Sequence, residues 1–164
     1  MIKLLISALV FLLFISCSND VPKKSIVKEK SLDLQVREAY LEGLKALEEG
    51  DVLFAARKFN EVEILFPQSD LAPKSSLMAA YSYYSQDYFE DCIMELQRFL
   101  RIYPKDKNLD YAYYLLGIAN YEQIVDEKKD TFAILKAKQY FQYLNQNYPN
   151  TEYSIDATFK INLI

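Results

Sequence analysis

The sequence predicts an all-α protein, folded as a right-handed superhelix of paired helices, an α-solenoid. The chain of 164 residues contains only 3 Gly and 5 Pro, so few positions would interrupt a helix. Small residues recur at Gly43, Ala80 and Gly117, and these positions are 37 residues apart. Pro67 and Pro104 are also 37 residues apart. A repeat of this length, punctuated by proline, indicates stacked helix pairs.

Each repeat also contains a small residue followed four positions later by a large one. The small residue lies twelve residues, and the large residue eight residues, before a proline: Pro67, Pro104 or Pro149. The pairs are Ala55–Phe59, Cys92–Leu96 and Ala137–Phe141. The small residue would let two helices approach closely while the large one fills the space beside it. This is the tetratricopeptide pattern; the alternative is an unrelated helical bundle with accidental spacing.

Residues 1–16 are predicted to be a lipoprotein signal peptide. Lys3 precedes an apolar run that is too short to span a bilayer but has the length of a signal-peptide core. The run ends in Phe14-Ile15-Ser16-Cys17, which resembles the bacterial lipobox. That resemblance implies that the chain is cut before Cys17 and that Cys17 carries acyl chains such as palmitate. The alternative is an ordinary secretory signal in which Cys17 is incidental.

Residues 17–34 are expected to form the lipidated cysteine and a flexible tether, because they hold Pro22, several charges and few large apolar residues. Several acyl chains would hold the protein firmly on a membrane, whereas a single chain gives only marginal binding. Ser18 stands where Asp would favour the inner membrane in many Gram-negative bacteria. The resemblance therefore implies an outer-membrane anchor with the domain facing the periplasm.

Residues 35–164 are expected to hold three repeats and the start of a fourth. In the first repeat we expect helices over about 35–49 and 52–66, separated by Gly50-Asp51. In the second repeat, Asp87 is a candidate N-cap of the second helix and Pro104 ends it. The inward positions of the first repeat's second helix are Ala55, Phe59, Val62 and Phe66. Those of the second repeat's second helix are Phe89, Cys92, Ile93, Leu96, Phe99, Leu100 and Tyr103.

The third repeat contains extra residues, most of them in a charged loop over 125–131. A last helix is expected to begin near Ser154, with Ile155, Phe159 and Leu163 on one face. A helix-pair stack needs a terminal cap with a polar outer face. We therefore expect the chain to be a truncated version of a longer protein; the alternative is that this helix is the cap.

Composition argues against several functional classes. The absence of His removes the commonest general base and metal ligand, and no phosphate-binding or nucleophile motif is found. A formal net charge of −4 argues against a nucleic-acid surface. We therefore expect a non-enzyme without cofactor or metal. Cys92 is expected to be a small core residue rather than a reactive thiol, since it lies on the apolar face of its helix.

Three stretches, together with the lipobox and tether, carry a resemblance to a known family. They are Arg98-Phe99-Leu100-Arg101-Ile102-Tyr103-Pro104, Asn108 to Gly117, and Tyr148 to Tyr153. The chain resembles the BamD family, the lipoprotein subunits of the machine that assembles β-barrels in the outer membrane. The resemblance implies an adaptor whose N-terminal repeats bind unfolded barrel precursors. It also implies that C-terminal repeats, largely missing here, dock on the BamA-type barrel protein and other subunits.

The repeat register predicts a groove along the first helix of each pair. With repeats starting at Val36, Pro73 and Asp110, positions two, five, nine and twelve face the groove. Tyrosine is frequent there, and it offers a large contact area with little rotamer entropy to lose. The candidate residues are Arg37, Tyr40, Lys74, Tyr81, Tyr84, Tyr111, Tyr114 and Tyr121, with Phe66 added from the family's aromatic-Pro step. The alternative is that the tyrosines pack between helices.

Two other functions compete with this reading. The first is a periplasmic tetratricopeptide scaffold of the Tol-Pal type, active in cell-envelope constriction. That family usually has an N-terminal coiled coil and no lipobox, and neither property fits this chain. The second is an envelope enzyme that uses repeats as a targeting arm, but these residues leave no room for a catalytic domain.

Overall fold

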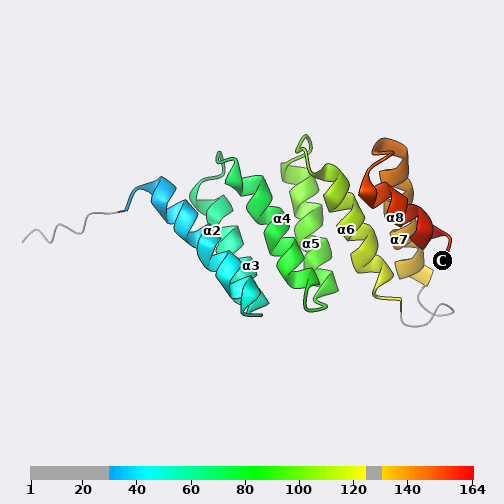
Figure 1. The fold of residues 1–164 in the computed structure, drawn as a ribbon, viewed down its shortest axis with the longest axis horizontal. Helices are drawn as coiled ribbons and strands as arrows, with labels where there is room; N and C mark the ends of the chain where they lie inside the picture. Colours follow the sequence, from blue (N-terminus) through cyan, green and yellow to red (C-terminus); the bar gives the residue numbers. More distant parts are fainter. Residues whose placement is uncertain (1–29, 125–130) are drawn as a thin grey trace, which may run out of the picture.

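The computed structural model describes residues 30–124 and 131–164, and within these ranges the chain forms seven α-helices and no strand (Figure 1). The helices lie side by side in chain order. In addition, α4 contacts α6, and α6 contacts α8. This arrangement confirms the predicted all-α solenoid of helix pairs. The helices are α2 (Leu32–Glu48), α3 (Val52–Leu65), α4 (Leu71–Tyr84), α5 (Phe89–Ile102), α6 (Leu109–Tyr121), α7 (Thr131–Asn147) and α8 (Glu152–Ile161).

Several sequence predictions fall outside the described residues. These are the signal peptide over 1–16, the lipidated Cys17, most of the tether, and the charged loop apart from Thr131. The first helix begins at Leu32, slightly earlier than expected. Ser31 is its N-cap, with a side-chain oxygen that accepts from the Leu34 backbone N–H, and Asp33 adds favourable negative charge in the first turn. Among the helices described, none is long and apolar enough to cross a membrane.

The recurring spacing of small and large residues reflects close helix contact. Phe59 and Phe141 are fully buried, and each ring lies against a glycine of the preceding helix. A Cβ added at Gly43 would lie 2.8 Å from Cε1 of Phe59, and one at Gly117 would collide with the Phe141 ring. The small residues on α2 and α6 therefore make room for the large ones on α3 and α7, as the sequence pattern predicts.

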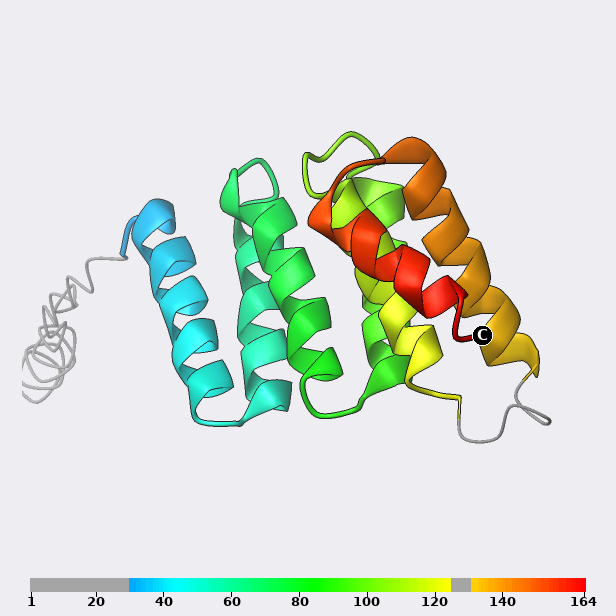
Figure 2. The same ribbon diagram turned by 45° about the vertical axis from the view of Figure 1, so that its right-hand side comes forward.

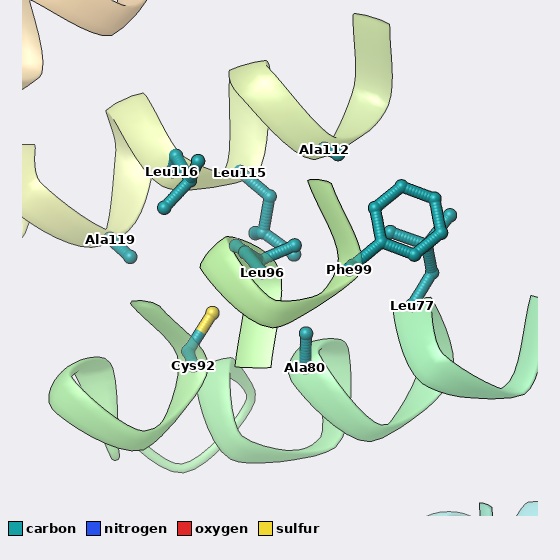
Figure 3. Packing of buried hydrophobic residues seen from close by; sticks show 9 residues of the cluster. All are labelled: Leu77, Ala80, Cys92, Leu96, Phe99, Ala112, Leu115, Leu116 and Ala119. Carbon is teal, nitrogen blue, oxygen red and sulfur yellow. The ribbon is translucent and has the colours of Figure 1, made fainter. Parts of the chain in front are cut away.

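The central core joins α4, α5 and α6 (Figure 3). Cys92 is fully buried in it, so the expected role as a core residue is confirmed. Burial, followed by the nearby charge of Glu95, raises the pKa of the Cys92 thiol to about 12. The thiol is therefore protonated at neutral pH and is a poor nucleophile. The buried members of the cluster are Leu77, Ala80, Cys92, Leu96, Phe99, Ala112, Leu115, Leu116 and Ala119.

Two local predictions are wrong. Asp87 is not the N-cap of α5, because that position belongs to Tyr88. Asp87 instead has a φ of 62°, and Gly50, which is 37 residues earlier, has a φ of 82°. The turn within each of the first two pairs thus needs one left-handed residue, a conformation open to Gly and tolerated by Asp. Phe66 does not face inward, since it follows the last residue of α3 and is exposed.

Candidate functional site

The predicted groove positions form a continuous row across the first helices of the pairs. The residue at position five of one helix pair lies close to the residue at position two of the next pair, as two contacts show. Lys74 Nζ on α4 lies 5.3 Å from the ring centroid of Tyr40 on α2. The Tyr114 hydroxyl on α6 donates a hydrogen bond to Asp156 Oδ2 on α8, at 2.7 Å. The register therefore extends to α8, which lies against α6 and α7 in Figure 2.

A cavity of about 390 Å³ lies in this row, at the N-terminal ends of α4, α6 and α8. Leu77 and Tyr111, the position-five and position-two residues of the second and third pairs, both line it. Its rim carries charges of both signs from Asp70, Lys74, Asp106 and Lys107, so it can contact both donors and acceptors of a peptide. The full lining is Asp70, Pro73, Lys74, Leu77, Met78, Asp106, Lys107, Asn108, Tyr111 and Tyr153.

The tyrosines of α6 are partly covered by α8. The ring centroid of Tyr153 lies 5.5 Å from that of Tyr111 and 5.1 Å from that of Tyr114. Burial is the main cause of the raised pKa of both Tyr111 and Tyr114, and the bond to Asp156 adds to it for Tyr114. Packing between helices thus accounts for much of their surface, while Tyr111 still lines the cavity.

The other candidates differ in how open they are. Tyr81 is the most open of the candidate tyrosines, with 39% of its surface exposed. Tyr84 packs near Phe89 of α5, with ring centroids 6.0 Å apart, and Tyr40 packs edge-on against Phe59 at 5.5 Å.

The candidate residues at the edges of the row make fewer contacts with the other candidates. Tyr121 is half-buried, with Lys160 Nζ 5.0 Å from its ring centroid. Arg37 is exposed and pairs with Asp33 on its own helix at 3.1 Å. Phe66 is not among the residues that line the cavity. The structure therefore brings Lys74, Tyr111 and their neighbours together and leaves Arg37 and Phe66 apart.

A polar cluster between the first two pairs has no counterpart in the sequence predictions. The Arg98 guanidinium of α5 donates to both carboxylate oxygens of Glu63 on α3, at 2.9 and 2.7 Å, and also to Glu95. It also lies 3.1 Å from the Ser76 hydroxyl on α4. The Tyr103 hydroxyl donates to Glu63 at 2.8 Å. Burial alone would lower the pKa of Arg98, but its bonds to Glu63 and Glu95 outweigh that effect and raise it.

The contact between one helix pair and the next is called a junction here. At the junction between the second and third pairs, the positions that correspond to Ser76 and Arg98 hold different side chains. At this junction Tyr113 stands where Ser76 does, and Tyr143 stands where Arg98 does. Their ring centroids are 4.2 Å apart, and Tyr148 lies 6.2 Å from Tyr113. The first junction is therefore charged and hydrogen-bonded, and the second is aromatic. The residues at two recurring positions, Ser76 and Arg98 at the first junction and Tyr113 and Tyr143 at the second, therefore differ in chemistry between the junctions.

Three half-buried tyrosines predict that the fold loses stability at alkaline pH. Burial raises the pKa of Tyr103, Tyr111 and Tyr114 above the ordinary value of 10.0. The unfolded chain therefore releases these protons first, so the free energy of unfolding is unaffected well below pH 10 and falls as pH rises above it. Urea unfolding followed by circular dichroism at about pH 9 and about pH 11 checks this. Tyr114→Phe should weaken the pH dependence, and an unchanged free energy of unfolding at the higher pH would contradict the prediction.

Comparison with known proteins identifies the class of protein to which this chain belongs. Residues 32–164 match the YfiO family, described as outer membrane lipoprotein. The chain is 34% identical over 148 residues to a protein of Caulobacter vibrioides, covering 90% of this chain and 48% of that protein. It is 30% identical over 125 residues to a protein of Rickettsia prowazekii, covering 76% and 50%. A protein of Neisseria gonorrhoeae is 32% identical over 139 residues, covering 79% and 52%.

All three relatives bear the name outer membrane protein assembly factor BamD. The chain belongs to the YfiO/BamD family, and the resemblance that the sequence motifs indicate is confirmed. The chain spans about half the length of the curated relatives it matches.

Proposed function

We propose that this chain is a non-catalytic adaptor for the assembly of β-barrel proteins in the outer membrane. The observation that carries the proposal is the family match over residues 32–164, supported by relatives named as assembly factors. In this proposal Cys17 carries the lipid anchor and the repeats face the periplasm. The family match favours this role over the Tol-Pal type of scaffold.

The substrate in this proposal is an unfolded β-barrel precursor, bound through an extended segment rich in aromatic side chains. The row of aromatic and basic residues across α2, α4 and α6 supports this choice. The cavity beside Lys74 and Tyr111 would take one side chain of the segment, and the open Tyr81 ring would contact another. Docking on a BamA-type barrel protein and other subunits belongs to the same proposal and rests on family membership.

Lys74→Glu combined with Tyr81→Ala is expected to weaken binding of a synthetic peptide copied from the last strand of an outer-membrane barrel protein. Truncating an anchor aromatic costs about 2 kcal/mol, which is roughly thirtyfold in affinity. Both side chains are exposed, so the helical circular dichroism spectrum should not change. Fluorescence anisotropy of the labelled peptide with the full chain measures the effect.

The matched control is Tyr88→Ala, because Tyr88 is 43% exposed, close to the 39% of Tyr81, but it is the N-cap of α5, the second helix of its pair, and occupies no groove position. Peptide affinity that is equal in the double variant and the control would refute the groove. Partners are tested separately by a pull-down of the lipidated chain from detergent-solubilised envelopes. Recovery of a BamA-type barrel supports the assembly role, and recovery of Tol-Pal components instead would overturn it.

A further inference from the structure

A second cavity, of about 800 Å³, lies between α3 and α5, which are the second helices of the first two pairs (Figure 1). We call it the α3–α5 cleft. None of its lining residues belongs to a first helix, so it is separate from the cavity of the groove. Two of them are exposed aliphatic side chains, Ile64 on α3 at 80% and Ile102 on α5 at 47%. The lining also includes Glu63, Pro67, Arg98 and Tyr103.

The helix pairs can stack without isoleucine at these two positions. In the repeat register, Ile64 corresponds to Arg101 of the second pair, and Ile102 corresponds to Asn147 of the third pair. Arg101 and Asn147 therefore hold the equivalent positions at the second junction, and both are polar and exposed. Single exposed apolar residues are ordinary on a protein surface, but two that line one cavity from neighbouring helices indicate a binding surface.

The charged groups at the cleft leave an excess of negative charge. The Arg98 guanidinium donates to both Glu63 and Glu95, so one positive group is shared between two carboxylates. The Tyr103 hydroxyl also donates to Glu63, at 2.8 Å, and brings no charge. The cluster is therefore complete in its hydrogen bonds around Arg98, yet it carries a net negative charge toward any group that enters the cleft.

The ends of both helices add to this negative potential. α3 ends at Leu65 and α5 ends at Ile102, and residues of both last turns line the cleft. The last carbonyls of a helix lack intrahelical donors, and this end of the helix dipole is negative. Arg101 offsets the effect at the end of α5, but it is exposed and is not a lining residue. The last turn of α3, which the structure describes in full, contains no basic residue.

We propose that the α3–α5 cleft binds a segment of a partner protein in which a lysine or arginine is flanked by aliphatic side chains. The aliphatic side chains pack against Ile64 and Ile102. The basic side chain lies near the two helix ends, where the carbonyls and the excess carboxylate charge attract it. An acidic segment of the same shape is repelled.

This interaction goes beyond the proposed adaptor function, because the groove lies on the first helices and the cleft lies between second helices. A peptide in the groove and a partner in the cleft can therefore bind at the same time. The two sites also fail or succeed independently in experiments, since no lining residue of one cavity lines the other.

The probe is a blocked peptide of sequence Ala-Leu-Lys-Leu-Ala, titrated into the purified full chain with isotope-labelled isoleucine δ1-methyl groups. The methyl NMR signals of Ile64 and Ile102 should shift saturably. A peptide with norleucine in place of lysine keeps the aliphatic stem without the charge, and it should bind about fivefold more weakly. A peptide with glutamate in place of lysine should bind more weakly still.

Ile64→Ser in the chain should weaken binding of the lysine peptide about fivefold, as followed by the Ile102 methyl signal. Met94→Ser is the matched control, because Met94 is 61% exposed on α5 but does not line the cleft. Tyr81→Ala, which alters the groove, should leave this binding unchanged.

Four outcomes would overturn the proposal. They are the absence of a saturable shift, equal affinity for the lysine and glutamate peptides, equal losses in Ile64→Ser and Met94→Ser, and a loss in Tyr81→Ala, which would place the peptide in the groove. The two methyl signals should also stay constant when the chain is diluted without peptide. A shift on dilution would show that a second copy of the chain occupies the cleft instead.

Discussion

Arg98→Met is expected to lower the free energy of unfolding by about 3–5 kcal/mol, because it leaves a buried carboxylate without its counter-charge. Glu63 is buried, and each of its two oxygens accepts a hydrogen bond from one terminal nitrogen of the guanidinium. Methionine keeps most of the aliphatic stem, so the loss reports on the charge rather than on packing. Urea unfolding of the full chain, followed by circular dichroism, measures the change.

Two companion variants separate the ion pair from a general effect of removing an arginine. Arg101→Met removes an exposed arginine from the same helix and should change stability little. Adding Glu63→Gln and Glu95→Gln to Arg98→Met should recover much of the loss, because no charge then remains buried. A loss as small as that of Arg101→Met would show that the cluster does not hold the first two pairs together.

Phe141→Ala is expected to destabilise the third pair by about 3–5 kcal/mol through lost burial and the cavity left behind. Phe141 is fully buried and its ring fills the space over Gly117. Phe132→Ala on the same helix is the control, because that side chain is largely exposed and its loss should cost little. Thermal and urea unfolding of both variants measure the difference.

The same contact reverses the usual effect of replacing a helical glycine. Alanine normally stabilises a helix interior by about 1 kcal/mol relative to glycine. Gly117→Ala should instead cost about 1–3 kcal/mol, because its Cβ would overlap the Phe141 ring. In a Phe141→Leu background the same substitution should cost less. A stabilising Gly117→Ala in the native background would show that the two helices do not approach so closely.

The fold follows from the sequence because its determinants are local and periodic. The recurrence of Gly43 and Gly117, and of Phe59 and Phe141, marks helix contacts that each repeat builds with the same residue types. Where the chain leaves a helix, periodicity no longer applies. Phe66 continues the pattern of α3 by spacing, but it lies one residue beyond the helix and turns outward.

The candidate groove is predictable in position but not in detail. The register identifies the row, and the contacts between Tyr40 and Lys74 and between Tyr114 and Asp156 follow it. The exposed fraction of each tyrosine depends on residues of the next pair, such as Tyr153, which packs against Tyr111. The pattern within a single repeat does not reveal these residues. The Arg98 cluster was missed for the same reason, because its partners come from three different helices.

The order of helix contacts has a consequence for folding kinetics. In the described part of the chain, the extensive helix contacts join each helix to the next helix along the chain or the next but one, so the contacting residues are close in sequence. Chains dominated by local contacts fold within microseconds to milliseconds, far faster than sheet proteins of similar stability. Nucleation can begin at any pair and spread in both directions. We therefore expect backbone amides of α4, α5 and α6 to exchange with solvent more slowly than those of α2 and α8, which have a neighbouring helix on one side only within residues 30–124 and 131–164.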